Sequence, residues 1–281
     1  MEVLADQAAV DNSAQGVQTS LSAIHMFWHG PALTRVERLC MASFVAHGHR
    51  VQLHVYDEPC GVPEGVRVTD ARQVLAEKEL FRHPKSGSMA IFADWFRYRV
   101  LFDQGGVWAD TDVVCLQPLS YPHTEVYAWE DEHQINNAVL GLPAGHELAL
   151  WMANCCESPN KILPYDDGRS KRRKWRRRFL EGNRRGNVKW GECGPLGFTT
   201  AARHLGYTQH ALPTWHFYPI HYRHWQTVFD QPYDVSLLGQ ARAVHLWNEM
   251  MRRELGFDKN ARFAADSLFE QLCHRYLKDD N

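Results

Sequence analysis

The sequence predicts an α/β protein with a mostly parallel sheet, on three observations near the N-terminus. Residues 23–28 form an apolar run that ends at a His-Gly-Pro turn. Residues 33–47 carry apolar side chains at helical spacing, and residues 51–56 alternate apolar and polar side chains. A strand–helix–strand order is typical of parallel sheets, whose strands are joined by crossover helices.

The next elements frame a short acidic turn. Residues 89–104 predict a helix, because Ile91, Trp95, Tyr98 and Phe102 recur at helical spacing, and a double glycine then ends it. Short strands are expected on both sides of an Asp-x-Asp triplet. Beyond residue 122 the pattern weakens, and we expect strands at 138–142 and 243–247 and helices at 147–155, 199–205 and 264–277.

Composition excludes several classes of protein. The chain has 281 residues, 44% hydrophobic residues and a formal net charge of -2, so no overall field favours nucleic acid. No signal peptide and no apolar run near the roughly 18 residues of a membrane span is found. The seven cysteines lack C-x-x-C spacing, which favours free thiols, and no H-E-x-x-H pattern indicates a zinc hydrolase. We expect a cytoplasmic protein, peripheral at most on the inner face of a membrane.

The chemistry is expected at Asp110 and Asp112. Two carboxylates two residues apart in a turn between strands can converge on one hard cation, and oxygen ligands suit Mn²⁺ or Mg²⁺. Such a triplet is common on solvated loops. Its frame of amphipathic helix, double glycine and apolar strands favours a metal that bridges a diphosphate.

These residues resemble the sugar-binding region of the DXD glycosyltransferases of family 32, which includes fungal, vertebrate α-1,4 and bacterial capsule and lipopolysaccharide enzymes. The resemblance rests on Ala93-Asp94-Trp95-Phe96-Arg97-Tyr98, Leu101 and Gly105-Gly106-Val107-Trp108-Ala109-Asp110-Thr111-Asp112. Trp108 stands where the family usually has Tyr, and Ala109 where Leu is frequent. Weaker similarities are Ile24-His25-Met26-Phe27-Trp28, Asn136-Asn137 and His245-Leu246-Trp247.

The resemblance implies a GT-A fold, which is a Rossmann-like sheet with helices on both faces. It also implies a nucleotide-sugar donor, with uridine diphosphate favoured over guanosine diphosphate, and transfer that retains the anomeric configuration. We expect a flexible segment at 1–22, a single GT-A domain at 23–281 and a basic insertion at 169–189. The sugar, the acceptor, the linkage and the oligomeric state are left open.

Several residues are candidates for the donor site, each with a structural alternative. Asp94 and Arg97, at i and i+3, either face the sugar and phosphate or form a helix-surface ion pair. Gly105 and Gly106 either admit the donor to the backbone or only end a helix. His245 is a third metal ligand or a core histidine. Trp28 and Trp247 line a nucleotide pocket or pack in the core; Asn136, Asn137 and Glu130 are candidates for the donor and acceptor sides.

A basic tract at 169–189 carries 11 of the 31 lysines and arginines and only Glu181 against them. A solvated helix and a nucleic-acid patch are two interpretations. A third is preferred: contact with anionic lipid headgroups or with a phosphorylated, lipid-linked acceptor.

Two expectations about function follow. The first is a metal-dependent, retaining glycosyltransferase of polysaccharide biosynthesis, with Asp110 and Asp112 as catalytic residues and a glycan or lipid-linked acceptor. Its rival is a non-catalytic protein of the same fold, recruited to membrane or nucleic acid by the basic tract. A metal-dependent phosphohydrolase is a weaker option, because it would need more clustered carboxylates.

Overall fold

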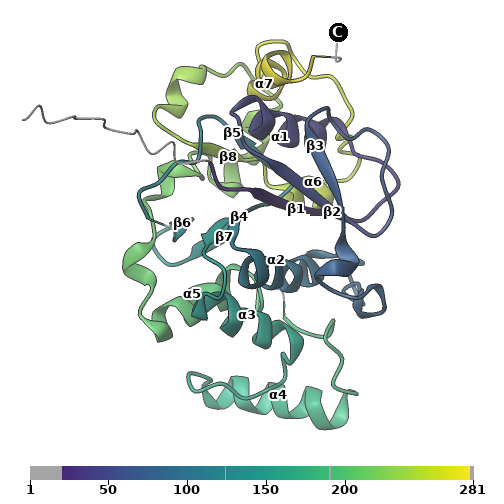
Figure 1. Cartoon of the computed structure of the whole chain (residues 1–281), viewed down its shortest axis with the longest axis vertical. Coiled ribbons are helices and arrows are strands. Elements are labelled where there is room, and N and C mark those ends of the chain that lie inside the picture. The colour runs from purple at the N-terminus through teal and green to yellow at the C-terminus, as the bar shows by residue number, and fades with distance from the viewer. Residues whose placement is uncertain (1–20, 124, 190, 279–281) are drawn as a thin grey trace, which may run out of the picture.

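A six-stranded sheet with the order β3-β2-β1-β4-β7-β6 forms the centre of the protein (Figure 1). The computed structural model describes residues 21–123, 125–189 and 191–278. Strands β3, β2, β1 and β4 run parallel, β7 pairs antiparallel with β4, and β6 pairs antiparallel with β7. The strands are β1 Ile24–Trp28, β2 Val51–Val55, β3 Val66–Asp70, β4 Gly106–Ala109, β6 Val126–Trp129 and β7 Ile135–Leu142. The expected α/β class with a mostly parallel sheet is confirmed.

Helices cover both faces of this sheet (Figure 1). On one face α1 and α7 pack over a cluster that includes Val36, Phe44 and Phe269. On the other, α2, α3 and α5 pack over a cluster that includes Phe96, Met152 and Phe198. The helices are α1 Arg35–Ala46, α2 Ala90–Gln104, α3 Glu147–Glu157, α4 Gly168–Leu180, α5 Pro195–Leu205, α6 Asn248–Arg253 and α7 Leu268–Tyr276. Every expected helix is present within a few residues of its predicted bounds.

Strands β3 and β6 are not predicted from the sequence. Both lie at the edges of the sheet, where short strands carry weak alternation. Strand β7 begins at Ile135, three residues before the expected start, and is buried along its whole length. Its first residues include Asn136 and Asn137, which rarely occupy strands unless their side chains find partners inside the protein.

The double glycine ends α2 as expected, but it lies far from the acidic turn. Gly105 has φ +67°, and a Cβ there would stand 2.6 Å from the Ala144 nitrogen; a Cβ on Gly106 would stand 2.9 Å from the Ala23 carbonyl oxygen. Gly106 begins β4, whereas Asp110 follows the end of that strand. These glycines therefore allow a close approach of the chain's own backbone, at the end of β4 that lies opposite Asp110, and nothing in this geometry supports their expected contact with the donor.

Within the described ranges, no helix is both long and apolar enough to cross a membrane. Residues 1–20 of the expected flexible segment at 1–22 lie outside the described residues.

A buried histidine pair joins the first two strands. His25 Nε2 lies 3.0 Å from the Gly105 carbonyl oxygen, and His25 Nδ1 lies 3.0 Å from His54 Nε2. Both contacts are satisfied when each ring is neutral and carries its proton on Nε2. The remaining nitrogen, His54 Nδ1, is buried without a partner. Burial lowers the pKa of His25 to about 4 and that of His54 to about 3.

We expect the pair to make the protein sensitive to mild acid. The unfolded chain takes up protons near the ordinary pKa of 6.5 and the folded pair does so only near 3 to 4, so stability falls as pH drops below 6.5. At pH 5 the loss is on the order of 2 kcal/mol per histidine. Urea unfolding at pH 7.5 and pH 5.0 should show a smaller loss for His54→Gln, whose amide still donates to His25. The exposed His274→Gln serves as control, and an equal loss in all three proteins contradicts the prediction.

Candidate active site

The acidic turn lies where two sheets meet. The Asp110 amide donates to the Ala138 carbonyl of β7 (2.8 Å), and the Val113 amide donates back to the Asp110 carbonyl (3.1 Å). Strand β5 (Val113–Cys115) then pairs antiparallel with β8 (Ala243–His245), which places Val113 opposite His245. A residue more than a hundred positions away in the sequence is thereby brought beside Asp112.

Asp110, Asp112 and His245 form one cluster of ligand groups. One donor atom from each lies within 4.8 Å of the other two. His245 Nε2 lies 3.0 Å from Asp112 Oδ2, and the Asn248 amide at the start of α6 donates to the same oxygen over 2.6 Å. His245 Nδ1 is buried without a partner. Two carboxylates and an imidazole are a donor set that divalent cations accept, so the residues fit the expected metal.

Electrostatics couple Asp112 and His245. Burial acts to raise the pKa of the Asp112 carboxyl, but His245 and the Asn248 amide outweigh it and hold that pKa below its usual value. Burial likewise acts to lower the pKa of His245, yet Asp112 beside it raises that pKa above the usual value. Each group therefore shifts the pKa of the other toward its charged form.

Arg97 fixes the second carboxylate. Its Nη2 donates to Asp110 Oδ1 over 2.6 Å, and its Nη1 donates to the Asn137 carbonyl oxygen over 2.6 Å. The Trp108 indole donates to the same Asp110 oxygen over 2.7 Å. Within the described residues Asp110 Oδ2 has no hydrogen bond, so it is the oxygen left for a ligand. Arg97 is buried at 3% exposure, so the structural alternative of a helix-surface ion pair does not hold: Arg97 pairs inside the protein with Asp110, and with Asp94 at 3.5 Å.

Asp94 lies on the same helix face as Arg97 and is held from β7. Asn137 Nδ2 donates to Asp94 Oδ1 (3.0 Å) and to the Tyr98 hydroxyl (2.8 Å). Burial raises the pKa of Asp94 to about 6, although Arg97 acts in the opposite direction. A Cβ on Gly194 would stand 3.1 Å from Asp94 Oδ2, so the segment before α5 approaches this carboxyl closely.

Asn136 and Glu130 form a second polar pair. Asn136 Nδ2 donates to Glu130 Oε2 over 2.7 Å, and its Oδ1 accepts from the Ala138 amide over 2.7 Å. Both side chains are buried. The Ala138 carbonyl also receives the Asp110 amide, so Asn136 supports the strand segment on which the acidic turn rests.

The two candidate tryptophans lie on different elements. Trp247 adopts a left-handed backbone with φ +62°, donates from Nε1 to the Ile220 carbonyl oxygen, and places its ring centroid 4.1 Å from that of His245. Trp28 ends β1, and Lys259 Nζ lies 5.6 Å from its ring centroid. Lys259 also donates to Asn248 Oδ1 over 3.2 Å. Because β1 and β4 are parallel neighbours, Trp28 and Asp110 lie at the carboxyl ends of adjacent strands, where ligands bind in open α/β sheets.

Sequence reasoning missed three members of this arrangement. Lys259 carried no signal, because it approaches Asp112 only through the fold. Tyr98 was assigned to a helix face, and its position four residues after Asp94 was the available hint. Asn248 directly follows His-Leu-Trp, and its contribution comes from the backbone amide rather than from the side chain.

Two known glycosyltransferase regions match this chain. The glycosyltransferase sugar-binding region containing DXD motif matches residues 53–136, and the alpha 1,4-glycosyltransferase conserved region matches residues 187–279. The first match contains Asp110 and Asp112, and the second contains His245. The matched regions therefore meet at the candidate metal cluster.

Individual relatives are glycosyltransferases. A human alpha-1,4-N-acetylglucosaminyltransferase is 23% identical over 67% of this chain and 52% of its own length. Lactosylceramide 4-alpha-galactosyltransferases of Pongo pygmaeus and Homo sapiens are 28% identical over 67% of this chain and over 78% and 48% of their lengths. The chain thus spans about half the length of most of these relatives. A solved structure named PaToxG Glycosyltransferase covers 66% of this chain and 69% of its own, at 13% identity and a TM-score of 0.46.

The matched regions lie on both sides of the segment 137–186 and agree with the motif in residues 93–112. The chain is thus similar to DXD-motif glycosyltransferases on both sides of that segment.

Proposed function

We propose that this protein is a retaining glycosyltransferase that moves a sugar from a nucleotide-sugar, with a UDP-sugar favoured, to a glycan or lipid-linked acceptor in polysaccharide biosynthesis. The observation that carries the proposal is the meeting of Asp110 and Asp112 with His245 at one point. Mn²⁺ or Mg²⁺ would be held by these three residues. When bound, such a cation neutralises charge that develops on the leaving diphosphate.

The surrounding residues divide the remaining work. Asp112 is kept ionised by His245 and Asn248, and Asp110 is kept in one orientation by Arg97 and Trp108. Asp94, held by Asn137, is placed to accept hydrogen bonds from donor sugar hydroxyls. Trp28 and Trp247 are proposed to flank the nucleotide.

Retention of configuration is proposed to follow a front-face route. No side chain stands out in the sequence as a nucleophile, so the leaving phosphate oxygen would accept the proton of the acceptor hydroxyl as the new bond forms. The rival hypothesis, a non-catalytic binding protein of the same fold, finds no support, because the relatives are named transferases.

We also propose peripheral contact of α4 with an anionic membrane. The helix is inverted relative to an ordinary surface helix: it buries Lys174 and Arg177, while Trp175 and Phe179 are 51% and 61% exposed. The buried cations pair with Asp166 and Glu192. The outward face therefore combines aromatic side chains with exposed arginines, which suits an anionic lipid surface.

We expect Asp112→Asn to abolish metal-dependent donor turnover, by about 100-fold or more, because a neutral amide cannot replace the carboxylate charge. Hydrolysis of a panel of sugar nucleotides with Mn²⁺, together with Mn²⁺ binding by calorimetry, measures the effect. Asp103→Asn, an exposed acid at the end of α2, is the control. Near-normal turnover and Mn²⁺ affinity in the Asp112 variant would overturn the assignment.

Arg97→Lys should not be conservative, because lysine cannot reach Asp110 and the Asn137 carbonyl with one planar fork. Stability should fall by about 2 kcal/mol, the scale of a lost charged hydrogen bond. Donor turnover measured well below the melting temperature should fall at least about tenfold. Arg99→Lys, on the same helix, is the control; a purely structural Arg97 would leave turnover unchanged.

Replacing Arg172 and Arg176 by Ser should weaken co-sedimentation with anionic liposomes. Each cation near such a surface contributes about 1 kcal/mol, so binding should drop by at least about tenfold at low salt. Arg173 and Arg177 are excluded, because both face the body of the protein and Arg177 neutralises Glu192. Arg67→Ser with Arg223→Ser makes the same charge change elsewhere. Failure of the unmodified protein to sediment at low salt would refute membrane contact.

A further inference from the structure

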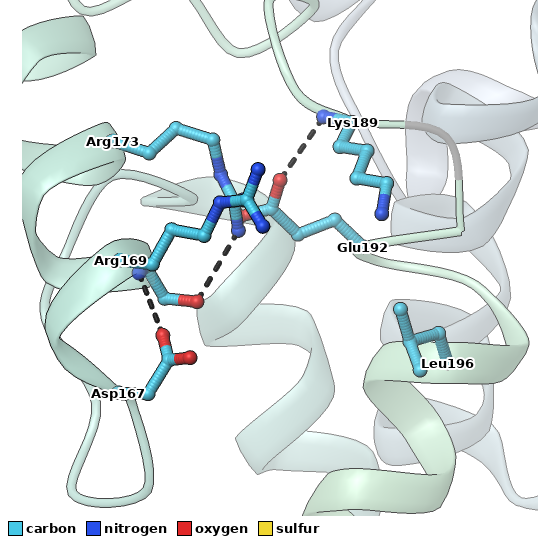
Figure 2. Close-up of a pocket in the computed structure, with 7 residues that line it drawn as sticks. Asp167, Arg169, Arg173, Lys189, Glu192 and Leu196 are labelled. Carbon is cyan, nitrogen blue, oxygen red and sulfur yellow. Dashed lines mark hydrogen bonds and ion pairs between the residues drawn. The ribbon is translucent and has the colours of Figure 1, made fainter.

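A cationic cleft lies between the start of α4 and a second wall that carries Lys189, Glu192 and Leu196. Figure 2 shows Arg169 and Arg173 extending into it from the helix and Lys189 extending into it from the opposite wall. Leu196 forms an apolar edge. The lining residues are Asp167, Arg169, Ser170, Arg173, Lys189, Glu192 and Leu196.

The acidic residues of this cleft are already committed. Glu192 accepts two hydrogen bonds from Arg177, at 2.9 and 2.7 Å, and another from the Lys189 amide at 3.0 Å. Asp167 caps α4 by accepting from the Ser170 amide over 2.7 Å. Four cations, Arg177 included, therefore face two carboxylates, and two positive charges remain in excess.

The cations that face the cleft have few protein partners. Within the described residues, the side chains of Arg169 and Lys189 make no hydrogen bond or ion pair. Arg173 lies 3.9 Å from Glu192 and 3.4 Å from the Ser170 hydroxyl, and its Nε is buried without a partner. Three cationic groups with unused donors around one hollow favour an oxyanion.

The cleft shares a wall with the proposed donor site. Glu192 and Leu196 line the cleft, while the residues between them contact the donor side. A Cβ on Gly194 would stand 3.1 Å from Asp94 Oδ2, and the Tyr98 hydroxyl donates to the Cys193 carbonyl over 3.1 Å. The segment that lines the cleft with Glu192 and Leu196 therefore also contacts Asp94 and Tyr98.

We propose that this cleft binds the phosphate group of the acceptor. The inference rests on the proposed transferase function for the role of the ligand, but not for its chemistry. Arg169, Arg173 and Lys189 would bind the phosphate oxygens, and the excess of two positive charges matches a dianion. Leu196 would contact the carbon skeleton next to the phosphate, whether that belongs to a lipid or to a sugar.

The test compares Arg169→Ser/Lys189→Ser with Arg172→Ser/Arg176→Ser, which makes the same charge change on the outward face of α4. Binding of inorganic phosphate is measured by calorimetry with EDTA present, so that no metal contributes. The unmodified protein and the outward-face variant should bind phosphate equally. The cleft variant should bind at least about tenfold more weakly, with unchanged thermal unfolding. Equal binding by all three, or no binding by the unmodified protein, would overturn the proposal.

Two further probes distinguish the source of the phosphate. Octyl phosphate binding more tightly than glucose 1-phosphate supports a lipid-linked acceptor, and the reverse supports a phosphorylated glycan. Donor hydrolysis with Mn²⁺ is measured on the same variants and should be unchanged. The two proposals can fail separately. If the cleft variant loses phosphate binding but the unmodified protein hydrolyses no donor, the anion site stands and the transferase role is rejected.

Discussion

The buried guanidinium of Arg97 is the interaction on which the site depends. It joins α2, the end of β4 and the backbone of β7, because its two terminal nitrogens bond Asp110 and the Asn137 carbonyl. A buried arginine without partners would be costly, so the surrounding chain must keep these acceptors in place. The same residue, Asn137, also fixes Asp94, because its side-chain amide donates a hydrogen bond to the Asp94 carboxylate. The second requirement is the pairing of β5 with β8, since only this pairing brings His245 to Asp112.

Much of the fold was predictable, because its central elements have strong local patterns. Helix α2 and strands β1, β2 and β4 combine regular apolar spacing with glycine or proline stops, and they are found close to the predicted bounds. The edge strands β3 and β6 escaped prediction because they are only five and four residues long, too short to show a clear periodicity. Strand β7 was shortened because its asparagines are unfavourable in isolation, and only tertiary contacts with Asp94 and Glu130 explain them.

The sequence indicated which residues form the site better than it indicated what each of them does. The cluster of Asp110, Asp112 and His245 assembles as expected. Gly105 and Gly106 were misplaced because adjacency in sequence does not reveal that β4 separates them from Asp110 by its whole length. Arg97 was expected to face the donor, with a helix-surface ion pair as the alternative; its contacts with Trp108, Asp110 and the Asn137 carbonyl add a supporting role that the sequence did not indicate. Lys259 could not be found, since nothing in its local sequence indicates a contact with Asn248.

Unlike the other long helices, α4 contributes no residue to the apolar cores that stabilise the fold. Within the described part of the chain, neither apolar cluster includes a residue of Gly168–Leu180. The helix is attached by ion pairs of Lys174 and Arg177 instead. Substitutions on its outward face should therefore cost little folding free energy, because surface changes away from packed features usually shift it by no more than about 0.5 kcal/mol. Because this outward face contributes nothing to either core, its residues can be exchanged to create a different attachment surface while the sheet stays intact.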